Sequence, residues 1–498
     1  MSTAYAPSGV KVKVYPYEDF QGIDASRDKA ALDTGQKQHL VEINNGFADW
    51  RGSIVRDPGA IQRTSGDRLI KHVAFYGRDK LVWAQLDGGG VSLKSDEDHF
   101  AEEVFPRNNV VTSTLYNNKV LFFCRDKSFY SYDGQQFKKV IAESDPRPAF
   151  GVAIQRRLAI AGAPDKRTTI DISRVDENNV FPADEDTSSS SVLKAADIDI
   201  ANIIGTADEI KGLGVFENNK LAVFTNDQTL VYSLHPDYTY WSIDDKANVK
   251  VGTISHNTIA PAGSDLMFCS RGGVHSLRRS DTNGVTIYSI PMSNKIDLYY
   301  RQLVSQVRNK EDISAFFDQD EGQYHIFFPI SELLCSRLTL TLNPMSGGES
   351  KWSTGTFLNA MNGKQLGGVT VLGTPGGVWE RMRIEDTPKF SPEMVITTPI
   401  LWQGAINDVK ESYSYILQAT GKGELTVEAF DERGRYLSAM QFLIEEGGKD
   451  DKFPDVPLSR QYERKFEHRY RGVQFRLTTQ GKGLLKVIGF AVTVRTGQ

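Results

Sequence analysis

The stretch LMFCSRGGVHSL, residues 266–277, contains a short apolar run, a polar turn with two glycines and a second run. Gly, Asn and Asp tolerate the positive φ angles of tight turns, so this pattern favours a β-hairpin. The same form recurs in LVWAQLDGGGVSL from Leu81, VLFFCRDKSFYSY from Val120, LAVFTNDQTLVYSL from Leu221 and VTVLGTPGGVWERM from Val369, and more loosely in RLAIAGAPDKRTTIDIS from Arg157 and YHIFFPISELLCSRLTLTL from Tyr324. The spacing of roughly 40 to 60 residues is close to that of propeller blades with insertions. The seven hairpins of this series therefore predict an all-β fold with a β-propeller.

Three side chains of the first stretch have reactive chemistry: Cys269, Arg271 and His275. A nucleophilic cysteine needs a base within reach and an environment that lowers its pKa, and a β-turn supplies neither. The equivalent positions of other hairpins carry Cys124, Arg125 and Tyr130, or Phe224, Asn226 and Leu230. We therefore interpret the stretch as one copy of a structural repeat with a buried thiol.

Composition shifts divide the chain into three parts. We predict an N-terminal arm at residues 1–60 that packs on a platform, a propeller at 61–390, and a C-terminal β-sandwich-like platform domain at 391–498. In the last part, Leu425, Val427 and Ala429 alternate with Glu424, Thr426 and Glu428, which is typical of a strand with one buried face. Two insertions interrupt the propeller: the acidic, polar residues 174–212 and an amphipathic helix within 294–315.

The composition excludes several classes of protein. The 498 residues include 58 Lys plus Arg and 63 Asp plus Glu, a net charge of -5, which is unlike a dedicated nucleic-acid binder. The N-terminus lacks the apolar core of a secretory signal, so we expect synthesis in a cytoplasm. Three scattered cysteines favour neither a disulfide framework nor a zinc site.

Two acidic segments contain carboxylates that could bind a divalent cation. DEDHFAEE, residues 96–103, has a high density of carboxylates but no calcium-loop spacing, and we interpret it as a solvated charge run. Asp318, Asp320 and Gly322 begin a calcium-loop pattern that lacks its distal Glu, which favours a tight turn. No nucleotide-binding loop, zinc-protease helix or hydrolase elbow is present. We predict no catalytic, cofactor-binding or metal-binding residues and no cofactor.

The segment 460–476 alternates basic and aromatic residues, RQYERKFEHRYRGVQFR. Such a pattern can follow a phosphate backbone. In strands it equally gives an aromatic core face with a basic outer face, which is either plain surface or a docking face for an acidic partner. The sequence leaves nucleic acid, protein and solvent open as its neighbours.

The order of several elements resembles the tail nozzle, or packaged-DNA stabilisation, proteins of short-tailed bacteriophages (podoviruses). These elements are DFQGIDASRDKAAL from Asp19, GSIVRDPG at 52–59, QRRLAIAGAPDKRTTIDISRVDENNVF at 155–181, LGVFENNKLAVFTNDQTLVYSL at 213–234, FDQDEGQYHIFFP at 317–329 and the closing RYRGVQFRLTTQGKGLLKVIGFAVTVR at 469–495. Each element alone is weak, and their order along most of the chain carries the resemblance.

The resemblance implies a β-propeller of six blades with a β-rich platform domain, in which case one of the seven hairpins belongs elsewhere; with all seven the propeller has seven blades. It also implies a non-enzymatic virion protein of the tail, made in the host cytoplasm. It further implies a homo-hexameric ring at the end of the tail, with an adaptor protein above it and tail spikes or fibres attached. Genomic DNA would pass through the channel without specific binding, since contacts of Lys or Arg with phosphate would retard it. The alternative is a carbohydrate-binding or glycoside-cleaving propeller, which needs two carboxylates in one cleft. A scaffold propeller is a third possibility.

Overall fold

The chain divides into two units in a computed structural model. Unit 1 contains residues 1–61, 338–357 and 381–498, and unit 2 contains residues 62–337 and 358–380. The structure describes residues 11–33, 38–64, 68–78, 80–184, 190–205, 207–216, 219–244, 248–263, 265–277, 291–342, 350–382, 392–445, 459–481 and 483–496. Within these ranges no helix is long and apolar enough to cross a membrane.

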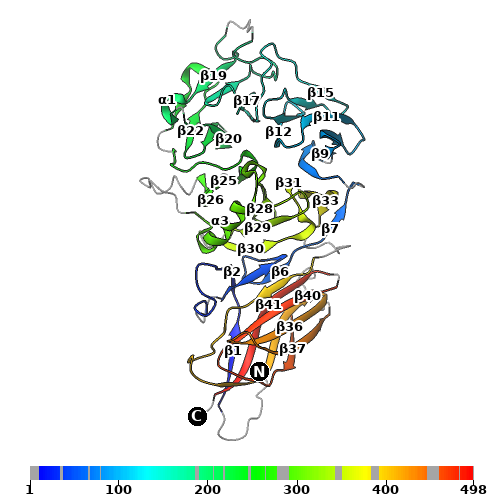
Figure 1. Ribbon diagram of the computed structural model, residues 1–498, viewed down its shortest axis with the longest axis vertical. Helices are drawn as coiled ribbons and strands as arrows, with labels where there is room; N and C mark the ends of the chain where they lie inside the picture. Colours follow the sequence, from blue (N-terminus) through cyan, green and yellow to red (C-terminus); the bar gives the residue numbers. More distant parts are fainter. Residues whose placement is uncertain are drawn as a thin grey trace, which may run out of the picture. The chain divides into compact units, whose positions relative to one another are not determined.

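Unit 2 consists of antiparallel sheets that follow one another in chain order. The first sheet comprises β8 (Ile70–Tyr76), β9 (Lys80–Asp87), β10 (Gly90–Ser95) and β11 (Phe100–Pro106), and the second β12 (Val111–Tyr116), β13 (Lys119–Cys124), β14 (Tyr130–Tyr132) and β15 (Phe137–Lys139). The third comprises β16 (Phe150–Ile154), β17 (Arg157–Ala161), β18 (Thr169–Ile172) and β19 (Ala196–Asp199). The fourth comprises β20 (Ile210–Phe216), β21 (Lys220–Thr225), β22 (Thr229–Ser233) and β23 (Ser242–Ile243). The fifth comprises β24 (Ala260–Ala262), β25 (Asp265–Ser270) and β26 (Gly273–Ser276), and the sixth β31 (Asn362–Leu366), β32 (Val369–Thr374), β33 (Gly377–Arg381) and β7 (Ala60–Gln62). Figure 1 shows them running from blue through green to yellow.

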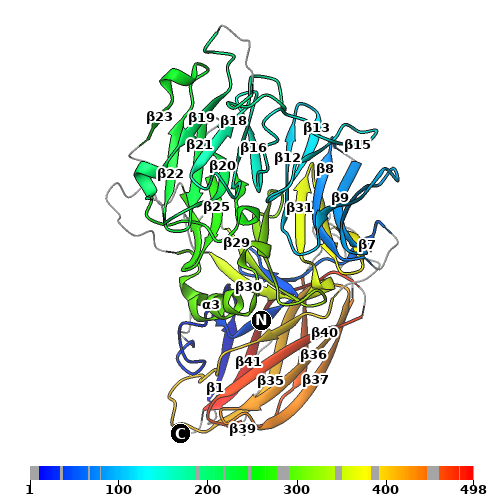
Figure 2. The same cartoon turned by 45° about the horizontal axis from the view of Figure 1, so that its top comes forward.

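The first strands of the sheets contact one another in chain order from β8 to β24. β24 and β31 both contact β27, and β31 returns to β8 (Figure 2). The ring is closed by residues from both ends of unit 2, because Arg63 N donates to Val378 O at 2.9 Å. Among the described residues, six separate sheets form the blades of this propeller. The strands β27 (Ser314–Asp318), β28 (Gln323–Pro329) and β29 (Cys335–Thr341) lie between the fifth and sixth of them. They are the extra member of the hairpin series predicted from the sequence.

Apolar side chains between neighbouring sheets form the core of unit 2. In β13, Val120, Phe122 and Cys124 belong to a cluster shared with the first sheet. The intervening Leu121 and Phe123 belong to a cluster shared with the third sheet. A strand covered on both faces has an unbroken apolar run, which explains the sequence VLFFC. Full burial of one such side chain contributes about 1.5–3 kcal/mol.

The helical elements are short and lie mainly in unit 2. They are α1 (Ala201–Ile204), η1 (Tyr238–Tyr240), η2 (His256–Thr258), η3 (Asn294–Ile296), α3 (Asp297–Gln306), η4 (Lys310–Asp312) and, spanning the division of the units, η5 (Phe357–Asn359). The amphipathic helix expected within 294–315 is α3, and its Tyr300 and Leu303 are buried. The acidic stretch 174–212, expected as an insertion, instead supplies β19 and the first residues of β20, because Ile198 and Ile210 join the core between the third and fourth sheets.

Unit 1 contains two further sheets. The first has the order β38 (Arg460–Lys465), β35 (Lys410–Gly421), β41 (Leu485–Thr496), β6 (Ile54–Arg56) and β5 (Gly46–Ala48), with β1 (Lys11–Tyr17) on β41 and β39 (Arg469–Tyr470) on β35. The second has the order β30 (Lys351–Gly355), β4 (Glu42–Asn44), β34 (Val395–Thr397), β40 (Val473–Gln480), β36 (Gly423–Asp431) and β37 (Tyr436–Ile444). A short parallel pair joins β2 (Phe20–Ile23) and β3 (Gln38–Leu40). In Figure 1, β1 in blue runs alongside β41 in red.

The two sheets of unit 1 enclose an aromatic core. Tyr415 of β35 and Phe490 of β41 stack at 5.3 Å between ring centroids, and Phe475 of β40 lies 5.0 Å from Tyr415. Gly22 of β2 has φ +81°, and a Cβ there would lie 2.7 Å from Trp352 N, so only glycine fits against β30. The fold is thus all-β, with a propeller and a C-terminal antiparallel β-domain, and the predicted fold class is confirmed.

The predicted boundaries at 60/61 and 390/391 differ from the division into units. Residues 338–357, expected within the propeller, belong to unit 1, because Thr354 of β30 pairs with Asn44 of β4. The residues expected as an arm supply strands to the sheets of unit 1 through β1, β4, β5 and β6. These pairings link residues more than 300 positions apart in sequence, which a local pattern cannot reveal.

Candidate functional site

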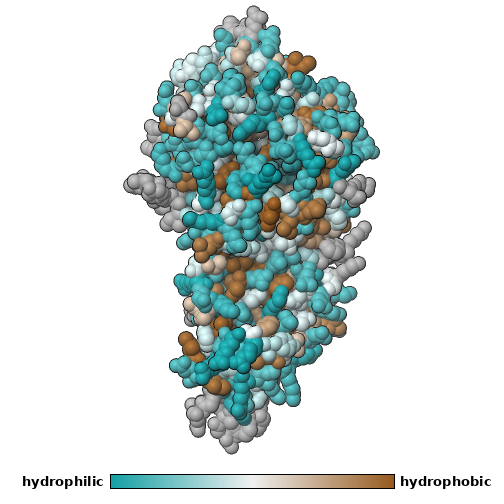
Figure 3. Space-filling view, in the orientation of Figure 1, coloured by the Kyte–Doolittle hydropathy of each residue, from teal (hydrophilic) through white to brown (hydrophobic). Residues whose placement is uncertain are grey.

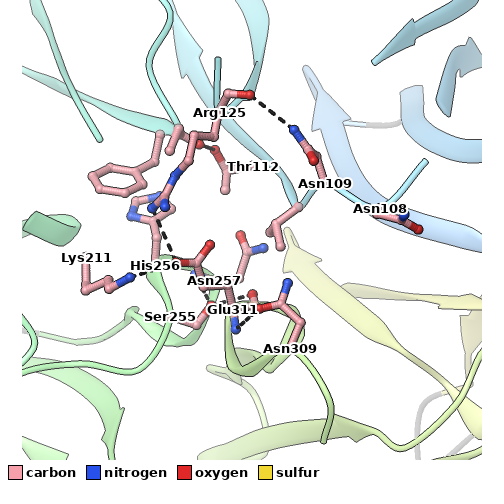
Figure 4. A pocket seen from close by; sticks show the side chains of 13 residues that line it. Asn108, Asn109, Thr112, Arg125, Lys211, Ser255, His256, Asn257, Asn309 and Glu311 are labelled. Carbon is pink, nitrogen blue, oxygen red and sulfur yellow. Dashed lines mark hydrogen bonds and ion pairs between the residues drawn. The ribbon is translucent and has the colours of Figure 1, made fainter. Parts of the chain in front are cut away.

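A cavity of about 120 Å³ lies in unit 2 where the chain enters the first strands of several sheets (Figure 4). Segments before β12, β16, β24 and β27, the start of β20 and one residue after β13 contribute its lining. The lining residues are Asn108, Asn109, Val110, Thr112, Arg125, Ala149, Phe150, Lys211, Ser255, His256, Asn257, Asn309 and Glu311. Since the first strands of the sheets surround the propeller axis, the cavity lies near that axis.

Charged side chains meet on one wall of the cavity. Oε1 of Glu311 accepts from Lys211 Nζ at 2.8 Å and from Arg125 Nη2 at 3.3 Å. Lys211 also forms an ion pair with Glu209, whose pKa the lysine lowers against an opposing effect of burial. Both cations of the cavity are therefore held by carboxylates of the same chain.

Polar side chains fix the loops around these charges. Asn109 Nδ2 donates to Arg125 O at 3.2 Å, and Asn257 Nδ2 donates to Val111 O at 3.2 Å. Ser255 Oγ donates to Glu311 O at 2.9 Å, which holds the backbone that carries the carboxylate. These hydrogen bonds thus hold the loops that line the cavity in fixed positions.

The imidazole of His256 stacks on Phe150 at 4.8 Å between ring centroids. Its Nδ1 accepts from Leu213 N at 3.3 Å, so the neutral ring carries its proton on Nε2. Burial, assisted by the charge of Lys364, lowers the pKa of His256 to about 3. Burial and the same lysine also lower the pKa of His72 to about 3, and its Nε2 lies 2.8 Å from Ser113 Oγ.

These histidines predict that the stability of unit 2 falls with acidification below about pH 6.5. Their folded pKa lies below the unfolded value, so the unfolded state binds more protons between the two values, and stability is lost as the pH falls through that window. We expect the thermal midpoint of His256→Gln to fall less than that of the wild type between about pH 7 and pH 5, above the carboxylate range. Calorimetry measures both profiles, with His235→Gln at an exposed side chain as the control. Parallel profiles for His256→Gln and the wild type would contradict the assignment.

A second cavity of about 450 Å³ lies beside the third sheet. Its carboxylates include Asp126, Asp145 and Asp171. Arg147 pairs with Asp126 at 3.7 Å and with Asp145 at 3.2 Å, and Lys166 pairs with Asp171 at 3.0 Å. Burial raises the pKa of Asp171, although Lys166 opposes the effect. These acids are engaged in ion pairs along the wall of the cavity.

The structure separates the reactive side chains of the opening stretch. Cys269 and His275 are both buried in the hairpin β25–β26, where His275 pairs with Phe268 and Cys269 with Val274. Because successive side chains alternate between faces, Cys269 and His275 point to opposite sides of the sheet. Burial raises the pKa of Cys269 to about 12 and lowers that of His275 to about 4. Cys269 and His275 therefore do not act together as nucleophile and general base.

The acidic segments hold turns and strands together. Asp96 Oδ2 accepts from Leu81 N, and Glu103 Oε1 accepts from Gly89 N. Asp318 Oδ1 accepts from the amides of Asp320 and Glu321 in the tight turn between β27 and β28, as its sequence indicated. Within the part of the chain that the structure describes, no group of His, Cys, Asp or Glu could hold a metal ion.

The basic and aromatic residues of segment 460–476 separate onto two faces. Phe466, Tyr470 and Phe475 are buried, whereas Arg464 and Arg476 are exposed. The guanidinium of Arg464 lies 5.5 Å from the ring centroid of Phe442. The alternation is thus that of a core face and a basic outer face, and the neighbour of the outer face stays open.

In the view of Figure 3 the surface is mainly hydrophilic with scattered hydrophobic side chains.

Sequence reasoning did not identify the cavity near the axis. In the chain, Glu311 lies 186 residues from Arg125 and 100 residues from Lys211. The sequence marks Arg125 only as the equivalent of Asn226 in another hairpin. The position of Arg125 directly after the second strand of a sheet, at the start of the turn, is the one signal that could have indicated a site residue.

The fold defines the chain as a β-propeller protein with a second, β-rich unit. No family model matches the chain, and no curated protein matches it. Among solved structures it is similar to virginiamycin B lyase from Staphylococcus aureus, with 10% identity over 65% of this chain and 97% of that one at a TM-score of 0.40. It is also similar to the extracellular domain of a hybrid two-component system from B. thetaiotaomicron, with 10% identity over 88% of this chain and 62% of that one at a TM-score of 0.41. YCF48 from Cyanidioschyzon merolae shares 11% identity over 66% of this chain and 99% of that one, at a TM-score of 0.35. These similarities say nothing of function.

Proposed function

We propose that this protein is a non-enzymatic virion protein, the hexameric nozzle at the end of a short bacteriophage tail. It closes and extends the DNA channel, retains the packaged genome and allows its ejection. An adaptor protein binds above the ring, and spikes or fibres attach to it. The chain is made in the host cytoplasm and functions in the virion.

The observation that supports this proposal best is the combination of a propeller with a β-rich unit built from both ends of the chain. The resemblance implies a propeller with a β-rich platform domain, and the sequence predicts an N-terminal arm packed on that domain. In unit 1, β1 pairs along its length with β41, from Lys11 with Thr496 to Tyr17 with Phe490. A scaffold made of one propeller alone has no need of this unit.

Two further properties agree with the proposal. A net charge of -5 suits a channel protein, because each contact of a cation with phosphate adds affinity through counterion release. A glycosidase needs two carboxylates across the substrate, whereas among the described residues Glu311 is the one carboxylate that lines the cavity near the axis. That carboxylate is paired with two cations.

The proposal predicts that the chain co-purifies with phage particles. Quantitative mass spectrometry of particles purified from the source lysate should give about one copy of this chain for every two portal subunits, as a six-fold ring on a twelve-fold portal requires. Electron microscopy of the isolated chain or tail should show a six-fold ring. Absence from particles, with the chain left in the soluble fraction, would refute the proposal and favour tests of glycan binding and hydrolysis.

A further inference from the structure

We propose that the cavity at Arg125 is a binding site for a small oxyanion, a phosphate or carboxylate group, and that Glu311 is an internal competitor for it. This site goes beyond the structural role proposed above and does not depend on it. The reasons lie in the donors of the cavity, in its charges and in the way Glu311 is held.

The cavity is rich in hydrogen-bond donors. Nε of Arg125 is buried and has no partner among the described residues. His256 accepts with Nδ1 and therefore presents an Nε2–H donor. Asn309 accepts with Oδ1 from Glu311 N, which leaves its amide nitrogen as a further donor. A buried donor without an acceptor is unfavourable, so an added acceptor group would be stabilised there.

The charges favour the same ligand. Arg125 and Lys211 direct their cations at one oxygen, Oε1 of Glu311. A guanidinium and an ammonium that converge in this way form the arrangement that proteins use for phosphate and carboxylate groups. Glu311 now occupies the position of the ligand oxygen.

The attachment of Glu311 allows its carboxylate to leave. Its backbone is fixed, because Glu311 N donates to Asn309 Oδ1 and Glu311 O accepts from Ser255. Its side chain is 30% exposed, and the ion pairs are open to solvent on one side. A rotation of this side chain alone would release Arg125 to an external anion, with Lys211, still paired with Glu209, beside it. Glu311 therefore keeps the affinity of the native site low and the bound anion exchangeable.

The size of the cavity agrees with a small ion. The cavity volume of about 120 Å³ is several times the ~10–15 Å³ that one water molecule needs. The space accommodates one tetrahedral or planar oxyanion with a few waters, and not a sugar chain. The ligand is thus a free anion or a single group at the end of a larger molecule.

Calorimetric titration of the full chain with sodium phosphate, and separately with sodium acetate, in chloride solution tests the proposal. We expect weak saturable binding by the wild type and at least about ten-fold tighter binding by Glu311→Gln, which keeps the side-chain volume but removes the competing charge. Arg125→Gln in the Glu311→Gln background should abolish the gain. The matched control is Glu332→Gln, which removes an exposed carboxylate paired with Arg107 in the same unit and should bind as the wild type does.

The two titrants distinguish the sources of the anion. Tighter binding of phosphate assigns the site to phosphate groups, tighter binding of acetate assigns it to carboxylates, and equal binding supports the shared chemistry. The proposal is overturned if Glu311→Gln binds neither anion more tightly than Glu332→Gln does. It is equally overturned if the double variant, shown to be folded by its thermal midpoint, binds as tightly as Glu311→Gln. If the double variant does not fold, the comparison of the two single variants decides. Particle composition is not a readout here, so this test is separate from that of the nozzle role.

Discussion

Replacement of Asp57 by Ala is expected to lower the free energy of unfolding of unit 1 by about 3–5 kcal/mol. Asp57 and Arg381 form an ion pair whose side chains are 2% and 3% exposed, with Arg381 Nη2 3.1 Å from Asp57 Oδ1. Removal of one partner of a buried ion pair costs far more than the loss of a surface pair. Native-state hydrogen exchange in β41 measures the effect.

Two further variants make this expectation specific. Glu445→Ala breaks the exposed pair with Arg460 in the same unit, and we expect a change below about 1 kcal/mol. The double variant Asp57→Ala with Arg381→Met should be more stable than Asp57→Ala alone, because the buried ion pair is then replaced by apolar side chains. If Asp57→Ala changed stability as little as Glu445→Ala does, the buried pair would have no structural role.

The blade hairpins could be predicted because their information is local. The turns of LMFCSRGGVHSL and its equivalents, and the apolar runs of strands covered on both faces, lie within about fifteen residues. The closure of the ring, with Arg63 on Val378, and the pairing of Thr354 with Asn44 depend on residues about 300 positions apart. No single-sequence pattern records such pairings, which is why the sequence groups residues 338–357 with the propeller whereas the structure has them in unit 1.

The cavity near the axis was missed for a related reason. Arg125, Lys211 and Glu311 each lie beside the end of a different strand, and each is an ordinary surface residue in its local sequence. Only the ring arrangement brings the ends of these strands together. The reactive stretch with Cys269 and His275 shows the reverse case, since proximity in sequence placed the two side chains on opposite faces.

Replacement of Phe475 by Ala is expected to destabilise unit 1 by about 3–5 kcal/mol. Its ring is fully buried between the sheets, 5.0 Å from Tyr415, 5.5 Å from Phe466 and 5.7 Å from Phe490 between centroids. The substitution removes both the buried apolar surface and the packing partners of three rings, and the surrounding strands can close only part of the resulting cavity. Urea denaturation followed by hydrogen exchange in β40 and β41 measures the loss.

Arg476, the residue after Phe475, provides a control that separates the effect of the basic residues from that of the aromatic residues. Arg476 follows Phe475 in β40 and points to solvent, so Arg476→Ala should change stability by no more than about 0.5 kcal/mol. Phe475→Leu, which retains most of the apolar volume, should fall between the two. A large loss for Arg476→Ala would mean that the basic face contributes to the fold of the chain. If only the Phe475 variants lose stability, the basic face is available for a partner, because its charges then do not contribute to the stability of unit 1.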